Sequence, residues 1–158
     1  MQYLLILDSF KGSVSSAEAA LHIKRGLDGG EIIPFSDGGE GFLTCVHASC
    51  GGEKVYIDVP DSYGRIIQTC YLRMGDTGVI ETALADGLVT VGKDHPNILG
   101  ASTVGTGLTI RKAMEDGCRK IIIGFGGSAT NDGGAGALHS LGARFYNGDT
   151  EVSPSGLC

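Results

Sequence analysis

Residues 3–35, YLLILDSFKGSVSSAEAALHIKRGLDGGEIIPF, decide the fold class of this chain. The apolar run at 3–7 has the length of a strand buried on both faces, and EIIPF at 31–35 predicts a second strand. Between them, Ser15 and Glu18 form the pattern of a capping box, which predicts that a helix begins there. Because a strand, a helix and a second strand are typical of a parallel sheet covered by helices, we expect an α/β fold.

A further helix and then a change of pattern follow. The segment GEGFLTCVHASC at 39–50 predicts a helix that two glycines stop. After Gly51, three stretches rich in Val, Ile, Tyr and Thr predict strands at 54–59, 65–74 and 78–84. The turn residues PDSYG and GDTG separate these strands, which indicates an antiparallel meander.

The rest of the sequence returns to alternating elements. A loop-like stretch precedes a predicted helix over 103–116, and a buried strand at 120–124 leads to a short helix and a last strand at 143–146. No internal repeat of fixed period is present. The change of pattern near Gly51 is the candidate domain boundary, and it divides the chain into residues 1–51 and 52–158.

Composition limits the function classes. The chain has 158 residues, 42% of them apolar, and a net charge of −6. No apolar run is long enough to cross a bilayer and no leader pattern is present, so we expect a soluble, cytoplasmic protein. Without a block of Lys and Arg, nucleic acid and membranes are poor partners. The five cysteines are scattered without a C-x-x-C pair, so neither a disulfide framework nor a zinc site is indicated.

Three predicted strands end in loops of the same kind: DSFKGS at 8–13, SDGGEG at 36–41 and FGGSATNDGGAG at 125–136. Ligands of open α/β sheets bind outside the carboxyl ends of parallel strands. Glycines allow a close approach of the backbone, and successive N–H groups with a helix N-terminus bind anions. These loops therefore predict a phosphate site, to which STVGTG at 102–107 could add hydroxyl donors.

The charged residues of these loops have both functional and structural interpretations. Lys11 is the one cation of the three loops; it either reaches a phosphate or carboxylate or is an ordinary solvated lysine. Asp8 either caps the following helix or faces Lys11 or a metal. Asp37, Glu40 and Asp132 are candidates for Mg²⁺ or for holding a substrate hydroxyl, while an Asp beside Gly also forms turns. Phosphoryl transfer needs little more than positioning, charge neutralisation and one carboxylate near the attacking hydroxyl.

The loops contain neither of the two common nucleotide-binding motifs in its full structural context. The sequence has no G-x-x-x-x-G-K-[ST], which excludes a Walker A protein. Gly124, Gly126 and Ala129 match G-x-G-x-x-[GA] after a strand, but TNDGG stands where the helix of a dinucleotide site should already have begun. An NAD-type reductase is therefore the functional interpretation that we rank last.

Four stretches together resemble one family. LDSFKGSVSSAEAA, PFSDGGEG, STVGTG and GCRKIIIGFGGSATNDGGAGALHSLGARF occur in the order and spacing of bacterial class I glycerate kinases. The resemblance implies a transferase that phosphorylates an organic acid, D-glycerate, usually at its 2-hydroxyl to give 2-phosphoglycerate, with ATP and Mg²⁺. The choice between the 2- and the 3-hydroxyl is left open. It also implies a flavodoxin-like parallel-sheet domain, into which a second α/β domain is inserted. That second domain has an antiparallel meander followed by α-β-α, like the restriction-endonuclease core.

The resemblance and the loops together define the expected site, in the cleft between the two domains. The expected catalytic residues are Lys11, Asp8, Asp37 and Asp132; the expected substrate- or phosphate-binding residues are Ser9, Ser13, Gly38, Gly39, Gly126, Gly127, Ser128, Thr130, Asn131 and Thr106; and the expected metal ligands are Glu40 and Asp37. Which loop binds ATP and which binds glycerate is left open, as is the identity of the general base.

Family members are more than twice this long, so we expect the chain to be an N-terminal part of a kinase. The alternative function is a non-catalytic anion- or nucleotide-binding module of the same fold. The expected partners are D-glycerate and ATP, without nucleic acid or membrane, and a homodimer is left open.

Overall fold

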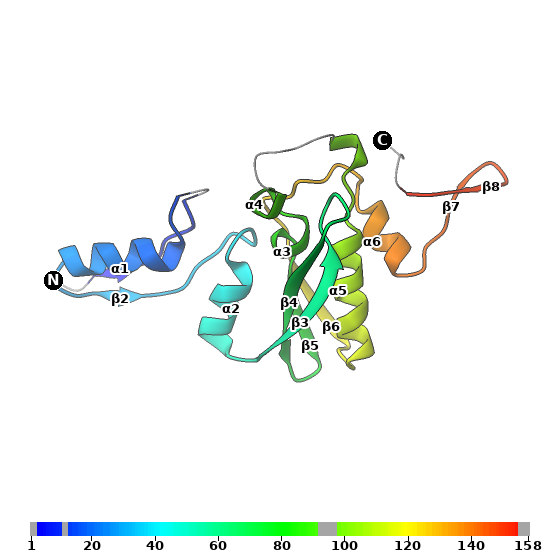
Figure 1. Ribbon diagram of the computed structural model, residues 1–158. Coiled ribbons are helices and arrows are strands. Elements are labelled where there is room, and N and C mark those ends of the chain that lie inside the picture. Colours follow the sequence, from blue (N-terminus) through cyan, green and yellow to red (C-terminus); the bar gives the residue numbers. More distant parts are fainter. Residues whose placement is uncertain (1–2, 11–12, 92–97, 155–158) are drawn as a thin grey trace.

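The computed structural model describes residues 3–10, 13–91 and 98–154 (Figure 1). A four-stranded sheet lies at its centre, the segment with the N-terminal helix extends to one side, and a small hairpin extends to the other. Lys11 was an expected site residue and lies outside the described residues. The chain has a mixed α/β fold with both parallel and antiparallel strand pairs.

The central sheet has the strand order β3-β4-β5-β6. Strands β3 (Glu53–Pro60), β4 (Ile66–Met74) and β5 (Thr77–Glu81) are antiparallel neighbours, which confirms the predicted meander. Strand β6 (Lys120–Gly124) pairs in parallel with β5, so that Glu81 lies opposite Gly124 at the end of the pair. The loops that follow β5 and β6 therefore leave the sheet at the same edge.

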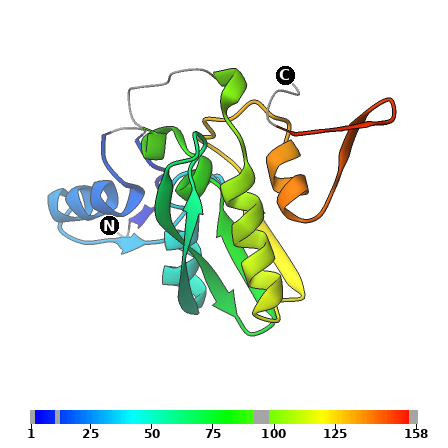
Figure 2. The same cartoon turned by 45° about the vertical axis from the view of Figure 1, so that its right-hand side comes forward.

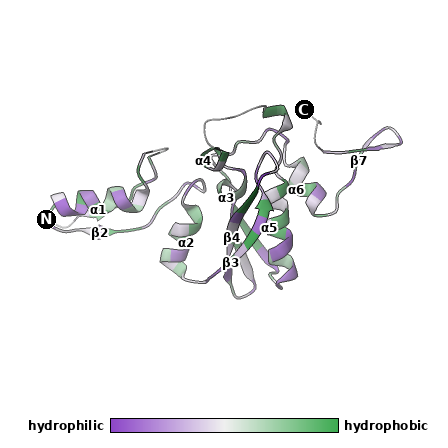
Figure 3. Ribbon diagram, viewed as in Figure 1, coloured by the Kyte–Doolittle hydropathy of each residue, from purple (hydrophilic) through white to green (hydrophobic). Residues whose placement is uncertain are grey.

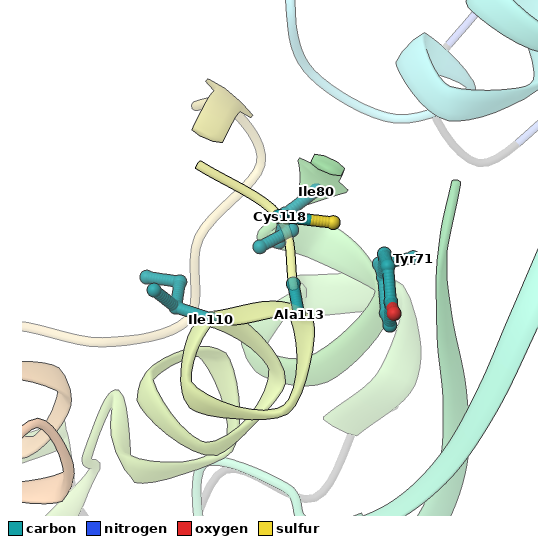
Figure 4. Close-up of a cluster of buried hydrophobic side chains, with 5 residues drawn as sticks. All are labelled: Tyr71, Ile80, Ile110, Ala113 and Cys118. Atoms are coloured by element: carbon teal, nitrogen blue, oxygen red, sulfur yellow. The ribbon is translucent and has the colours of Figure 1, made fainter. Parts of the chain in front are cut away.

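Helices cover both faces of this sheet (Figure 2). On one face, helix α5 (Val104–Glu115) packs Ile110 and Ala113 against Tyr71, Ile80 and Cys118, the cluster drawn in Figure 4. On the other face, Leu43 of helix α2 (Phe42–Cys50) packs against Leu72 of β4 and Val79 of β5, and Phe42 and Val46 lie around this second cluster. Strands buried by apolar side chains on both faces explain the continuous apolar runs of the sequence.

The N-terminal segment forms a strand, a helix and a parallel strand, as predicted. Strands β1 (Leu4–Leu5) and β2 (Glu31–Ile32) pair in parallel and are only two residues long. Helix α1 (Ser16–Gly26) begins at the predicted capping box: the Ser15 hydroxyl accepts from the backbone N–H of Glu18, and the Glu18 carboxylate accepts from that of Ser15. Helix α2 follows this segment in sequence but packs on the central sheet. The domain boundary at residue 51 stays a prediction.

The structure differs from the sequence prediction after β5 and near the C-terminal end. The strand expected to reach residue 84 ends at Glu81, and helix α3 (Ala83–Asp86) begins at once, because alanine and leucine favour a helix there. The stretch expected as a loop contains helix α4 (Leu88–Val91) and the 3₁₀ turn η1 (Ile98–Gly100).

Helix α6 (Ala135–Ser140) is followed by a hairpin of β7 (Phe145–Asn147) and β8 (Thr150–Val152), whose second strand was not predicted. The hydropathy colours of Figure 3 are green on α4 and in the central sheet, whereas much of the β7–β8 hairpin is purple. Among the described helices, none has the length and apolar character needed to span a membrane.

Candidate functional site

Two of the predicted glycine loops lie against each other with backbone touching backbone. A Cβ atom added to Gly126 would lie 2.5 Å from the Cα of Gly39, and one added to Gly38 would lie 3.7 Å from the backbone of Phe125. The absence of a side chain at Gly126 is therefore what lets the loop after β2 rest on the loop after β6. The structure thus brings together residues that are about ninety positions apart in sequence.

Glu81, at the end of β5, fixes the start of helix α2. Its side chain is buried, with 4% of the residue exposed, and its two oxygens accept 2.9 Å hydrogen bonds from the N–H groups of Gly41 and Leu43. Burial raises the pKa of Glu81, and these two hydrogen bonds oppose the rise. Sequence analysis missed this residue, although an acid at the end of the apolar run GVIE was a signal.

Asp132 fixes the start of helix α6. Its carboxylate accepts hydrogen bonds from the N–H groups of Gly134 and Gly136 and from both the N–H and the hydroxyl of Thr103, at 2.8–3.0 Å. Burial opposes ionisation, but these hydrogen bonds outweigh it and hold the pKa of Asp132 below its ordinary value. An ionised Asp132 therefore joins the glycine loop to the loop that precedes α5.

The helices that follow the three predicted loops consequently carry acids of the chain itself at their N-termini. Glu18 lies at α1, Glu81 at α2 and Asp132 at α6. The Glu81 and Asp132 carboxylates bind N–H groups at the positive ends of α2 and α6, and the Glu18 carboxylate binds the N–H of the cap residue Ser15. A phosphate at these loops would have to be bound by other donors.

Two cavities meet at Glu40. The first, here called the α3–α4 cavity, has a volume of about 370 Å³ and is lined by Glu40, Glu81, Ala83, Leu84, Gly87, Leu88, Val89, Thr90 and Gly127. The second, here called the N-terminal cavity, has a volume of about 380 Å³ and is lined by Phe10, Ser13, Val14, Ser15, Glu18, Glu40 and Val89. Since both include Glu40 and Val89, residues of all three predicted loops line two neighbouring cavities that share Glu40.

The catalytic residues expected from the sequence have different surroundings. Asp8 is half-buried, and its carboxylate accepts a 2.7 Å hydrogen bond from the N–H of Ser9. It does not cap α1, because Ser15 does. Asp37 is exposed and accepts from the N–H of Gly39 at 2.8 Å, which is the turn-forming contact considered in the sequence analysis.

The expected binding residues divide into two groups. Ser13 lines the N-terminal cavity and Gly127 lines the α3–α4 cavity. Ser128 is exposed and pairs with Gly87, so the loop after β6 runs beside the start of α4. Among the described residues, Thr106, Thr130 and Asn131 do not line either cavity, and Thr106 is buried in the first turn of α5.

Asp86, the last residue of α3, is the second acid that sequence analysis missed. Only 1% of the residue is exposed, and neither carboxylate oxygen has a hydrogen-bond partner; the nearby Thr106 hydroxyl is likewise unpartnered. Burial raises the pKa of Asp86 to about 7, with smaller contributions from the negative charges of Asp132 and Asp61, while the proximity of Thr106 opposes the rise. Its backbone carbonyl accepts from the N–H of Ala129.

The carboxylates of the described residues form no cluster of three or more metal-ligating side chains. Magnesium is commonly held by one or two carboxylates, with water and phosphate oxygens completing its shell. The half-buried Glu40, placed where two cavities meet, fits that smaller donor set.

The comparisons with known proteins agree on one family. A model of the glycerate kinase family matches residues 3–157. The glycerate kinase of Bacillus subtilis (strain 168) is 40% identical, over 99% of this chain and 43% of that protein. The glycerate 2-kinase of Escherichia coli (strain K12) is 38% identical, over 91% of this chain and 40% of that protein.

A solved structure gives the same result for the fold. The crystal structure assigned as glycerate kinase 2 from Salmonella typhimurium LT2 matches with a TM-score of 0.71 at 38% identity, over 91% of this chain and 41% of that one. This chain therefore belongs to the glycerate kinase family, and it spans about two fifths of the length of these relatives.

Proposed function

We propose that this protein takes part in the ATP-dependent phosphorylation of D-glycerate at its 2-hydroxyl. Membership of the family supports a kinase acting on glycerate. The observation that carries the proposal is the meeting of the three loops at Glu40, between two cavities large enough for two small substrates. In the reaction, the hydroxyl oxygen bonds to the terminal phosphorus of ATP while the bond to ADP breaks, and the hydroxyl proton passes to a carboxylate.

The residues of the site take the following roles in this proposal. Glu40 and Asp37 hold Mg²⁺, which would neutralise charge on the phosphates. Lys11 adds a positive charge from its glycine-flanked position in the sequence, which lies outside the described residues. Asp8 and Asp37 are the alternatives for accepting the proton, and Asp132 positions the glycine loop through its four short hydrogen bonds.

Glycine loops supply the remaining contacts in the proposal. The gathering of the loops supports Ser13, Gly127 and Ser128 as members of the substrate- and phosphate-binding set, together with Ser9 beside Asp8. Thr106, Thr130 and Asn131 line neither cavity, so direct contact of these three with a ligand there is not part of the proposal. We further propose that residues 1–51 belong to a flavodoxin-like domain and 52–158 to an inserted domain with a restriction-endonuclease-like core. The enzyme would act on small molecules in the cytoplasm.

The test is a phosphotransfer assay with the purified full chain, ATP, Mg²⁺ and D-glycerate, with the product identified by ³¹P NMR as the 2- or 3-phosphate. We expect Glu40→Gln to lower kcat at least 100-fold and to raise the Mg²⁺ concentration needed for half-maximal rate, because one ligand oxygen loses its charge. Glu53→Gln, at an exposed carboxylate at the start of β3, is the matched control and should retain full activity.

The outcomes separate the proposal from its alternative. Full activity of Glu40→Gln would remove this carboxylate from the reaction. A protein that binds ATP but never transfers phosphate to D-glycerate would instead be a nucleotide-binding module.

A further inference from the structure

The α3–α4 cavity differs in chemistry from what D-glycerate requires. Its walls include the side chains of Ala83, Leu84, Leu88 and Val89, which are hydrocarbon throughout. D-Glycerate carries a carboxylate and two hydroxyls on three carbons, and burying these groups against hydrocarbon would leave them without hydrogen-bond partners. The cavity therefore suits a ligand group with apolar faces.

A nucleobase has these properties. It is planar, with apolar faces and a few polar atoms on its edge, and ligand cavities of this kind are lined mainly by apolar side chains with a small number of placed polar groups. The volume of about 370 Å³ lies within the range of small-molecule sites. At the wall, the Thr90 hydroxyl donates to the carbonyl of Ala83 at 3.0 Å, which leaves its oxygen able to accept from a base amino group.

The position of the cavity also fits a nucleotide. The N–H of Leu88 donates to the carbonyl of Gly127 at 2.8 Å, which fixes α4 against the glycine loop after β6. Glu40 stands at the rim shared with the N-terminal cavity. A base in the α3–α4 cavity would therefore have its phosphates leave beside the Gly127 loop and Glu40, toward the second cavity.

We propose that the α3–α4 cavity binds the nucleobase of the phosphate donor, and that the more polar N-terminal cavity receives the hydroxy acid. This assignment rests on the proposed function and decides which part of the site takes which substrate. Leu88 is its main specificity-determining side chain, because it lines the α3–α4 cavity and is absent from the wall of the N-terminal cavity. Glu81 contributes a wall only, since both its oxygens already accept hydrogen bonds from α2.

The experiment replaces Leu88 by tryptophan, which would fill the cavity. Isothermal titration of the purified full chain should show at least a 10-fold increase in the Kd for ATP. The Kd for inorganic tripolyphosphate, which has no base, should change less than 2-fold, and so should the KM for D-glycerate. Ile122→Trp on β6 is the matched control, because Ile122 and Leu88 are each 48% exposed and Ile122 lies on neither cavity wall.

A second variant covers the case in which Leu88→Trp does not fold. Leu88→Ala shortens an exposed side chain and removes part of the apolar wall, so ATP should bind about 3- to 10-fold more weakly while tripolyphosphate binds as before. Unchanged ATP affinity in the folded variants would overturn the assignment, and so would an equal loss for ATP and tripolyphosphate. A rise confined to the KM for D-glycerate would reverse the two cavities.

The proposed function can fail separately. If the Leu88 variants bind ATP more weakly than the wild type, as expected, but the wild type phosphorylates no D-glycerate, the base site stands and the kinase assignment fails. If D-glycerate is phosphorylated while both Leu88 variants keep the wild-type KM for ATP, the kinase assignment stands and the base site fails.

Discussion

Glu81 and Asp86 stand at the two ends of one short connection, the turn from β5 through α3, and both are acids buried beside a helix N-terminus. Glu81 receives two 2.9 Å backbone hydrogen bonds from α2, whereas neither Asp86 oxygen has a hydrogen-bond partner of good geometry, and only the nearby hydroxyl and N–H of Thr106 favour its charged form. Burial costs a carboxylate its hydration in both places, but only Glu81 recovers part of that cost through N–H hydrogen bonds of good geometry. The difference shows that the hydrogen-bond donors around a buried acid, more than its depth of burial, decide whether it stabilises this fold.

The largest expected effect is that of Glu81→Ala. Removing the carboxylate leaves the N–H groups of Gly41 and Leu43 without their acceptors, so we expect a loss of about 3 kcal/mol in the free energy of unfolding. Urea denaturation at pH 7 measures it, with Glu53→Ala, an exposed acid of β3, as control. A loss no larger than that of the control would show that α2 does not depend on Glu81.

Replacing Asp86 should have the opposite effect on stability, and the size of that effect should depend on pH. Its pKa is about 7 in the folded protein against 3.8 for an ordinary aspartate, so the folded state holds a proton that the unfolded state has lost. The stabilising contribution is complete below pH 4, falls as the pH rises towards 7 and is absent above it, a total of roughly 4 kcal/mol.

Asp86→Asn removes this titration. The stability of the variant relative to the wild type should rise by roughly 2.5 kcal/mol between pH 5 and pH 8, as measured by urea denaturation at both values, because about two pH units of this window lie below the pKa of Asp86. Asp58→Asn, at an exposed residue of β3, should show no such gain. Parallel pH profiles of the wild type and Asp86→Asn would mean that folding does not raise the pKa of Asp86.

The smallest effect is expected at Ser15, where the helix cap is exposed. Ser15→Ala removes the hydroxyl that accepts from the N–H of Glu18, and should cost about 1 kcal/mol because water replaces the lost acceptor. Ser49→Ala, an exposed serine of α2, is the matched control and should lose nothing. A cost at Ser15 equal to that at Glu81 would mean that burial does not amplify the loss of a cap.

The sequence predicted those features that depend on neighbouring residues. The cap at Ser15, the meander and the strand at 120–124 were predicted from local patterns, and the structure confirms them. The contact of Glu81 with α2 joins residues about forty positions apart, and the burial of Asp86 depends on how α3 and α5 pack. Neither follows from a local pattern.

The candidate site was predicted in the same partial way. The glycines of the loops after β2 and β6 do lie against each other, but β2 and β6 belong to different sheets, so the shared sheet edge assumed from the sequence is not what brings the loops together. The helix N-termini behind those loops were expected to bind an anion, but acids of the chain bind them instead: Glu81, about forty residues away, at α2, and the neighbouring Asp132 at α6. The roles of Asp37, Glu40 and the other site residues stay predictions that the experiments above test.

The contact between Gly39 and Gly126 has a consequence for how the molecule can vary. Here the distance between the loop after β2 and the loop after β6 allows only the hydrogen atoms of the glycine Cα atoms between them. A Cβ added to Gly126 would lie 2.5 Å from the Cα of Gly39. Because this contact is made by backbone atoms, no neighbouring side chain can be replaced by a smaller one to make room. A side chain at Gly126 should therefore displace the segment that contains β1, α1 and β2 as a body and leave its internal structure intact, whereas a Cβ at Gly39 would lie 3.5 Å from Gly126, an ordinary contact distance.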